Sequence, residues 1–286
     1  MYTEAECIEH HTGYTPRSIM TKGNSVAIGT EYGNFIRGNK DKLMISYRRE
    51  PSHDYTMMGA CGVLFEGEIH FFGGYNYTNE GTDLSRQHFV IETKRRGQLV
   101  QMTKKEDLDI EFLFSSCSSF EMTSEYIVVI LCFDFYQQKS CFSFDGDLTQ
   151  NINGDSNYEH YYGALTRYKS SLLAVGGFAD NQKTEILKRD ENINLRWSVV
   201  EPDFEFNPGN YIYDHSLVTV ESSDINEEYV CLIGGVSNGV ILDNVFKFNG
   251  TWSSFGRLIK PRRRSNLIYW NGAGNRTSAR VNFDTN

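Results

Sequence analysis

The sequence lacks several features that would place it in other classes. It contains no run of about 18 apolar residues, which a membrane-spanning helix needs, so we expect no membrane partner. It lacks an excess of positive charge: 28 Lys and Arg stand against 37 Asp and Glu, and the net charge of −9 opposes nucleic-acid binding. Its first residues lack the basic and apolar stretches of an export signal, so we expect a cytoplasmic protein, with a secreted fragment as the alternative.

The motifs of common enzymes and metal sites are also missing. The sequence contains neither a Gly-rich phosphate loop nor an HExxH motif. Cys7, His10 and His11 lie close together, but no second pair of ligands follows at zinc-like spacing. We therefore expect no catalytic residues, no metal and no cofactor.

Cysteine is present without the spacing of a ligand motif. The six Cys residues include no CxxC, and a chain of 286 residues does not need a disulfide scaffold, so small buried thiols are the expected state. Cys132 and Cys141 are the exception to consider. They flank the turn-like segment 134–139 and would face each other across a hairpin, where an oxidising compartment would allow a disulfide.

Aromatic residues are abundant where proline is scarce. Tyr, Phe and Trp make up 14% of the chain, with 17 Tyr and 19 Phe against only 5 Pro. This balance is typical of many half-buried strands joined by turns. The composition therefore predicts an all-β fold.

An internal repeat organises the chain. An apolar strand that ends in a glycine pair occurs at 69–74, 172–177 and 230–235, and the pairs begin 103 residues (176 − 73) and 58 residues (234 − 176) apart. A degenerate copy is expected between the first two, at 127–132, where Leu-Cys or Phe-Asp replaces the glycines. One predicted strand precedes each pair and two follow it. Four antiparallel strands per repeat are the pattern of a propeller blade.

These residues make the chain similar to the Kelch repeat family, in which a glycine pair closes the second strand and a Trp lies in the fourth. The matching residues are Gly73, Gly74, Gly176, Gly177, Trp197, Gly234, Gly235 and Trp252. The resemblance implies a β-propeller of four-stranded antiparallel blades, about five in number with six as the alternative, one of them closed by both chain ends. We expect an N-terminal arm at 1–23 and the propeller at 24–286. The glycines and tryptophans are assigned structural roles, because Gly permits crowded strands and Trp fills space between blades.

The resemblance also implies a non-enzymatic adaptor or scaffold that binds a protein or peptide at one mouth of the propeller. Aromatic residues recur in the loops after the glycine pairs, and arginines occur in a loop between blades, where they would meet an acidic peptide. The predicted partner-binding residues are Tyr75, Tyr77, Phe135, Tyr136, Phe178, Arg262 and Arg264. The alternatives are that these aromatics fold back onto their blades, that the chain is a copper oxidase or sugar-processing enzyme on the same fold, or that it is an extracellular adhesive module.

Two further patterns favour structure over chemistry. His160 and His215 fall at similar points in successive copies, which favours a packing or hydrogen-bonding role over catalysis.

Sequons for N-glycosylation occur at Asn76, Asn249 and Asn275. Three is near the chance number for this composition, so they carry no weight for secretion.

Overall fold

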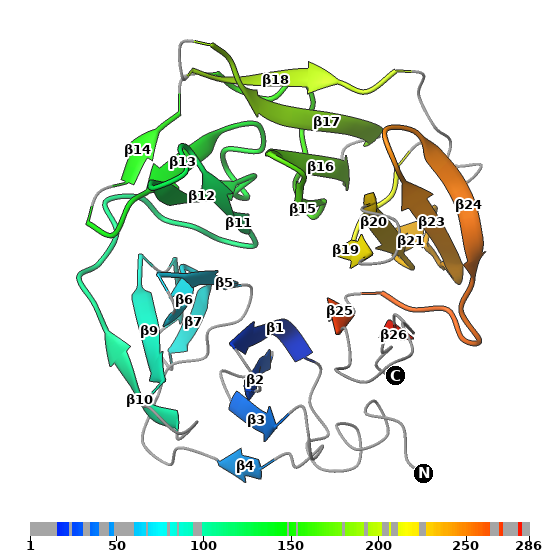
Figure 1. Ribbon diagram of the computed structural model, residues 1–286. Helices are drawn as coiled ribbons and strands as arrows, with labels where there is room; N and C mark the ends of the chain where they lie inside the picture. Colours follow the sequence, from blue (N-terminus) through cyan, green and yellow to red (C-terminus); the bar gives the residue numbers. More distant parts are fainter. Residues whose placement is uncertain are drawn as a thin grey trace.

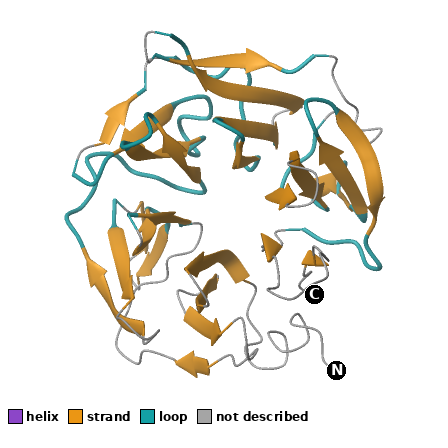
Figure 2. Ribbon diagram, viewed as in Figure 1, coloured by secondary structure: helices purple, strands orange, loops and turns teal. Residues whose placement is uncertain are grey.

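The computed structural model consists of β-strands and the loops that join them, which confirms the all-β prediction (Figure 2). It describes residues 16–22, 25–30, 35–39, 46–48, 60–66, 68–78, 81–84, 86–93, 99–147, 149–152, 154–178, 181–191, 194–201, 206, 211–222, 227–263, 269–270 and 280–281. No helix occurs among these residues.

Five four-stranded antiparallel sheets follow one another along the chain. The first contains β1 (Pro16–Lys22), β2 (Ser25–Thr30), β3 (Phe35–Asn39) and β4 (Ser46–Arg48). The second contains β5 (Cys61–Phe65), β6 (Glu68–Phe72), β9 (His88–Thr93) and β10 (Leu99–Lys104). The third contains β11 (Ser116–Glu121), β12 (Ile127–Cys132), β13 (Cys141–Phe144) and β14 (Thr149–Asn151). The fourth contains β15 (Ala164–Tyr168), β16 (Ser171–Gly177), β17 (Asn181–Arg189) and β18 (Leu195–Val199).

The fifth sheet and three small hairpins complete the described strands. The fifth sheet contains β19 (Ser216–Ser222), β20 (Glu227–Ile233), β23 (Asn244–Phe248) and β24 (Trp252–Arg257). The hairpins are β7 (Tyr75–Thr78) with β8 (Gly81–Leu84), β21 (Val236–Ser237) with β22 (Val240–Ile241), and β25 (Tyr269–Trp270) with β26 (Arg280–Val281). The first two hairpins are insertions between the second and third strands of the second and fifth sheets.

The sheets are arranged around a common centre in chain order (Figure 1). Neighbouring sheets meet through their first strands, in the sequence β1, β5, β11, β15, β19 and β25. The second strands of the third and fourth sheets, β12 and β16, each lie between the two adjacent sheets. In β12, Val129 and Leu131 pack toward the second sheet, while Val128 and Ile130 pack toward the fourth. Burial on both faces explains why these second strands are continuous apolar runs instead of alternating ones.

The described residues near the chain ends bear on two expectations. Residues 16–22, assigned to an N-terminal arm, form β1 and pair with β2, whose edge would otherwise expose unpaired backbone groups. The expected blade built from both ends is not seen in the described residues either. The first sheet takes all four strands from residues 16–48, while β25 and β26 pair with each other.

The glycine pairs lie against the linkers that lead to the next sheet. A Cβ atom on Gly73, Gly176 or Gly234 would lie 2.2, 2.3 and 2.3 Å from the carbonyl oxygens of Phe112, Ile212 and Arg262, respectively. Each of these glycines also has a φ of 62 to 64°. Any side chain at the first position of the pair would therefore collide with the linker that leads to the next sheet.

The degenerate copy has Phe133 and Asp134 at the positions of the glycines. Phe133 keeps the left-handed backbone, with a φ of 64°, although it carries a large side chain. That side chain is buried, and its ring lies 4.8 Å from His160 and 5.7 Å from Trp197, measured between ring centres. Packing between the third and fourth sheets thus supports a conformation that non-glycine residues seldom adopt.

The two predicted tryptophans also lie between sheets. Trp197 packs against the core shared by the third and fourth sheets. Trp252, in the fifth sheet, donates its indole hydrogen to Thr184 Oγ1 in the fourth sheet at 2.8 Å. Trp197 therefore lies at the interface with the sheet that precedes its own, and Trp252 bonds directly to the sheet that precedes its own.

The expectation of free thiols is wrong for Cys61 and Cys117, whereas Cys132 and Cys141, the pair considered as an exception, are bridged. A disulfide joins Cys61 in β5 to Cys117 in β11, and a second joins Cys132 to Cys141 across the β12–β13 pair. Cys231 is free and buried. Composition misses the first bridge because it depends on the approach of two sheets, whereas the hairpin geometry suggested for the second matches the register.

Candidate interaction surface

One end of the sheets is built from two kinds of segment. Because successive strands run in opposite directions, the loops after the second strands and the linkers before the first strands meet at the same end of each sheet. In the third to fifth sheets the described residues of these segments are 133–140, 178, 234–243, 105–115, 152, 154–163, 200–201, 206 and 211–215. The turns at 122–126, 169–170 and 249–251 lie at the opposite end.

The first end carries a continuous network of aromatic side chains, which we call the aromatic surface. Its members are Phe114, Phe135, Tyr136, Tyr161, Tyr162, Phe178, Tyr211 and Tyr213. Successive ring centres are 4.1 to 6.5 Å apart. The network extends across loops of three consecutive sheets, and the paired rings stabilise one another beyond the area they bury.

Asp134 fixes the part of the surface that comes from the third sheet. Its buried carboxylate accepts hydrogen bonds from the backbone nitrogen of Leu113 at 2.6 Å and from that of Tyr136 at 2.9 Å. The backbone nitrogen of Phe135 donates to the Leu113 carbonyl at 3.1 Å. The aromatic loop is thereby tied to the linker that precedes its own sheet.

Backbone hydrogen bonds position the tyrosines of the next two linkers. Phe178 donates to the carbonyl of Tyr161 at 2.8 Å, and Asp214 donates to that of Tyr162 at 3.0 Å. Tyr213 forms a two-way backbone bridge with Val236, at the base of the β21–β22 hairpin. These hydrogen bonds fix the backbone that carries the rings, so the shape of the aromatic surface is largely preorganised.

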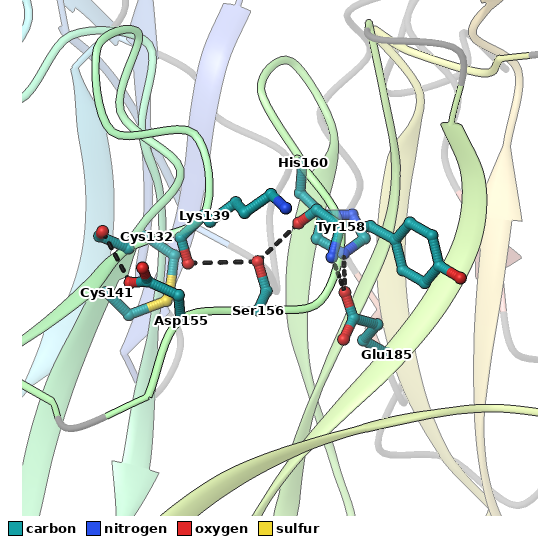
Figure 3. Close-up of a disulfide and its surroundings, with 9 residues drawn as sticks. Cys132, Lys139, Cys141, Asp155, Ser156, Tyr158, His160 and Glu185 are labelled. Carbon is teal, nitrogen blue, oxygen red and sulfur yellow. Dashed lines mark hydrogen bonds and ion pairs between the residues drawn. A yellow bond between two sulfur atoms is a disulfide. The ribbon is translucent and has the colours of Figure 1, made fainter.

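A buried ion pair anchors the 157–163 segment beneath the surface (Figure 3). Glu185, on β17, accepts hydrogen bonds from the Asn157 amide nitrogens at 2.6 and 3.0 Å, from the Tyr158 nitrogen at 2.9 Å and from His160 Nε2 at 3.0 Å. His160 Nδ1 lies 2.5 Å from the carbonyl oxygen of Gly176. Both ring nitrogens of His160 therefore lie within hydrogen-bonding distance of an oxygen atom, which holds the ring between β16 and β17.

The protonation of Glu185 follows from competing effects. Burial alone would raise the pKa of its carboxyl, but the hydrogen bonds from His160 and Asn157 and the charge of His160 lower the pKa below the ordinary value of 4.5. Neither Glu185 nor His160 exposes any side-chain surface. The pair therefore acts as an internal tether for the linker that carries Tyr161 and Tyr162.

Three of the predicted partner-binding residues are exposed members of the aromatic surface. Phe135, Tyr136 and Phe178 retain 38%, 65% and 53% of their exposure, so they do not fold back completely onto their sheets. Tyr75 and Tyr77 lie on β7, which follows the first glycine pair, but their side chains are outside the described structure. Arg264 is also outside the described residues.

Arg262 lies differently from what the sequence suggested. Its side chain is 8% exposed, and its carbonyl oxygen accepts a hydrogen bond from the Gly235 nitrogen at 2.7 Å. The segment is drawn inward because it meets the third glycine pair at the junction after the fifth sheet. A guanidinium buried in this way offers little surface to an acidic peptide.

Sequence reasoning did not single out the five aromatic residues of the linkers. The apolar pattern before the second and third glycine pairs suggests strands that begin at residues 161 and 212, which would place Tyr161, Tyr162 and Tyr213 inside strands. The strands begin later, at residues 164 and 216, which leaves the tyrosines outside them. A usable signal was present, since Tyr161-Tyr162 and Tyr211-x-Tyr213 occur before the first strands of consecutive copies. The same boundaries separate the two histidines: His160 lies four residues before β15 (164 − 160), whereas His215 immediately precedes β19.

Two structural tests of other functions concern only the described part of the chain. In that part, no group of three or more His, Cys, Asp and Glu side chains is placed to hold a metal ion. The same residues include no helix of the length and apolarity needed to cross a membrane.

Comparison with known proteins gives a fold but no family. No protein-family model matches the chain, and no curated protein matches it significantly. A solved structure titled "Structure of YjhT" is similar, with a TM-score of 0.67 and 14% sequence identity over 90% of this chain and 88% of that chain. At this identity the likeness concerns the fold alone.

Proposed function

We propose that this chain is a Kelch-type β-propeller that acts as a non-enzymatic interaction module, binding a protein or peptide through the aromatic surface. The propeller architecture is supported by the order in which the first strands contact one another and by the same close contact at three glycine pairs. The two-stranded β25–β26 sheet, which follows five four-stranded sheets, supports six blades over five.

The observation that carries the binding function is the exposure of Phe135, Tyr136 and Phe178 on a surface fixed by backbone hydrogen bonds. Loops are usually polar, and exposed aromatic side chains that touch one another are costly in water unless a partner covers them. Tyr and Phe provide large contact areas with little loss of side-chain entropy, which suits the centre of an interface.

The charge of the chain indicates the chemistry of the bound segment. With a net charge of −9 and Arg262 buried, an acidic peptide is a poor fit. Aromatic ring faces attract cations, with about 0.5–1 kcal/mol per exposed contact. We therefore expect a segment that combines Lys or Arg with apolar side chains, and binding that weakens as salt is added.

A peptide-display selection against the full chain tests this function. The expected outcome is enrichment of basic, apolar peptides whose affinity falls at least about tenfold in a variant with Tyr136→Ala and Phe178→Ala. Tyr126→Ala is the matched control, because Tyr126 is an exposed tyrosine, at 46%, in the turn at the opposite end of the third sheet. Peptides that bind the double variant as well as the unmodified chain would show that the aromatic surface is not the site. Turnover in a screen of oxidase and glycan substrates would favour the enzyme alternative instead.

A further inference from the structure

The turn between β23 and β24 presents an N-glycosylation sequon on a rigid base. Asn249, Gly250 and Thr251 are all exposed. They are flanked by Phe248 and Trp252, which are buried, pair across the two strands and have ring centres 5.0 Å apart. The sequon therefore projects as a three-residue tip from an ordered hairpin.

The backbone of this tip suits a modified asparagine. The Asn249 nitrogen donates to the Thr251 carbonyl at 3.1 Å, and Gly250 has a φ of 82°, so the chain reverses sharply at the residue between Asn and Thr. A Cβ atom on Gly250 would meet no atom within 4 Å, which shows that the tip stands clear of the rest of the fold.

The disulfides supply an independent observation. Four of the five described cysteines are bridged, and such pairs persist in oxidising compartments, where N-glycosylation also takes place. On sequence alone the sequons were at chance level. The two disulfides make it more meaningful that this sequon is exposed, because both features fit an oxidising compartment. The same disulfides disfavour the predicted cytoplasmic location.

We propose that Asn249 is an N-glycosylation site. Its side-chain amide nitrogen would attack C1 of the first sugar of an oligosaccharide carried on a lipid pyrophosphate. The new C1–N bond replaces the C1–O bond to phosphate, the lipid pyrophosphate leaves with the bonding electrons, and the amide nitrogen loses one proton to a base of the transferring enzyme. Because 249–251 lies at the opposite end of the fifth sheet from the aromatic surface, the glycan leaves that surface open.

The test is expression of the full chain in animal cells with an appended endoplasmic-reticulum signal. Secreted and cell-retained protein are both analysed, since the sugar is attached before export. Amidase release of N-glycans in ¹⁸O-water converts a glycosylated asparagine into a labelled aspartate that peptide mass spectrometry detects. We expect label at Asn249 in most molecules, its loss in Asn249→Gln and in Thr251→Ala, and no change at this position in Asn76→Gln.

Thr251→Ala removes the hydroxyl that the transferring enzyme needs, together with one methyl group at an exposed turn position, so it separates modification from folding. Disulfide mapping of the same samples shows whether each variant has folded. Unlabelled Asn249 in protein that carries both disulfides would overturn the proposal. So would label that persists at Asn249 in Thr251→Ala.

Discussion

The carbonyl oxygen of Ile212 occupies the space where a side chain on Gly176 would begin, 2.3 Å from the position of its Cβ atom. Ile212 belongs to the linker before the fifth sheet, and Gly176 closes the second strand of the fourth. The contact is therefore a junction between neighbouring sheets, and it recurs at Gly73 and Gly234.

Gly176→Ala should destabilise the protein by about 3 kcal/mol or more, because it adds overlap with backbone to the strain of a positive φ. Gly250→Ala is the control. Its φ of 82° is also positive, but nothing lies within 4 Å of the added Cβ, so only about 1 kcal/mol should be lost. Urea denaturation of both variants measures the difference, and equal losses would mean that the junction relaxes freely.

Glu185→Gln should lower the free energy of unfolding by about 3–5 kcal/mol, since it leaves His160 buried without its carboxylate. The exposed pair of Arg167 and Glu121, 3.2 Å apart, offers a matched control. Glu121→Gln should cost less than about 1 kcal/mol. If the two variants unfold at the same urea concentration, the buried pair does not hold the linker. Weakened peptide binding by Glu185→Gln under conditions where it remains folded would further support a positioning role for the pair.

Acid should destabilise the protein through three buried histidines. His70 Nδ1 and His88 Nε2 lie 2.9 Å apart. Burial is the main effect that lowers both pKa values to about 4. The charge of Lys105 adds to this effect for His70, and the charges of His70 and Lys105 add to it for His88. Burial and the nearby charge of His160 lower the pKa of His215 to about 3.

These histidines are neutral in the folded protein, while the unfolded chain takes up protons near pH 6.5. Their contribution to stability is complete above that pH and should decline by a few kcal/mol, in order of magnitude, between about pH 6.5 and pH 4. Urea midpoints measured across this range test the decline. Replacing His70 and His88 together with Phe should flatten it, and an unchanged slope would assign the acid sensitivity to other groups.

Non-reducing peptide mapping should find Cys61 linked to Cys117 and Cys132 linked to Cys141. The bridge between β5 and β11 closes the longer loop, with a sequence separation of 56 against 9, so its replacement by two alanines should destabilise more, by about 4 against about 3 kcal/mol. Cys231 should react with thiol reagents only after unfolding, because burial raises its pKa to about 11. Rapid labelling of any of the four bridged cysteines in the native protein would contradict the pairing.

The repeat could be predicted from the sequence because its signals are local. A glycine pair is required wherever a linker passes so close to a strand, and a buried strand needs an apolar run whichever sheets cover it. Phe133 shows the limit of the first rule, since favourable packing against His160 and Trp197 maintains a left-handed residue without glycine.

The candidate surface could be predicted only in part. Phe135, Tyr136 and Phe178 follow the second strands directly, so their position was readable. The tyrosines of the linkers were not, because their exposure depends on where the first strands begin. The burial of Arg262 depends on a contact with Gly235, which lies 27 residues earlier (262 − 235) in the chain, so no local sequence pattern indicates it.

The disulfide between β5 and β11 also determines how the molecule extends when force is applied at its two termini. Cys61 and Cys117 enclose the whole second sheet in a closed loop, so tension applied at the two termini passes through the sulfur atoms and bypasses that sheet. Pulled in a single-molecule experiment, the oxidised protein would lengthen as though those intervening residues were missing. After reduction of the disulfide, the measured contour length would increase by the length of those residues.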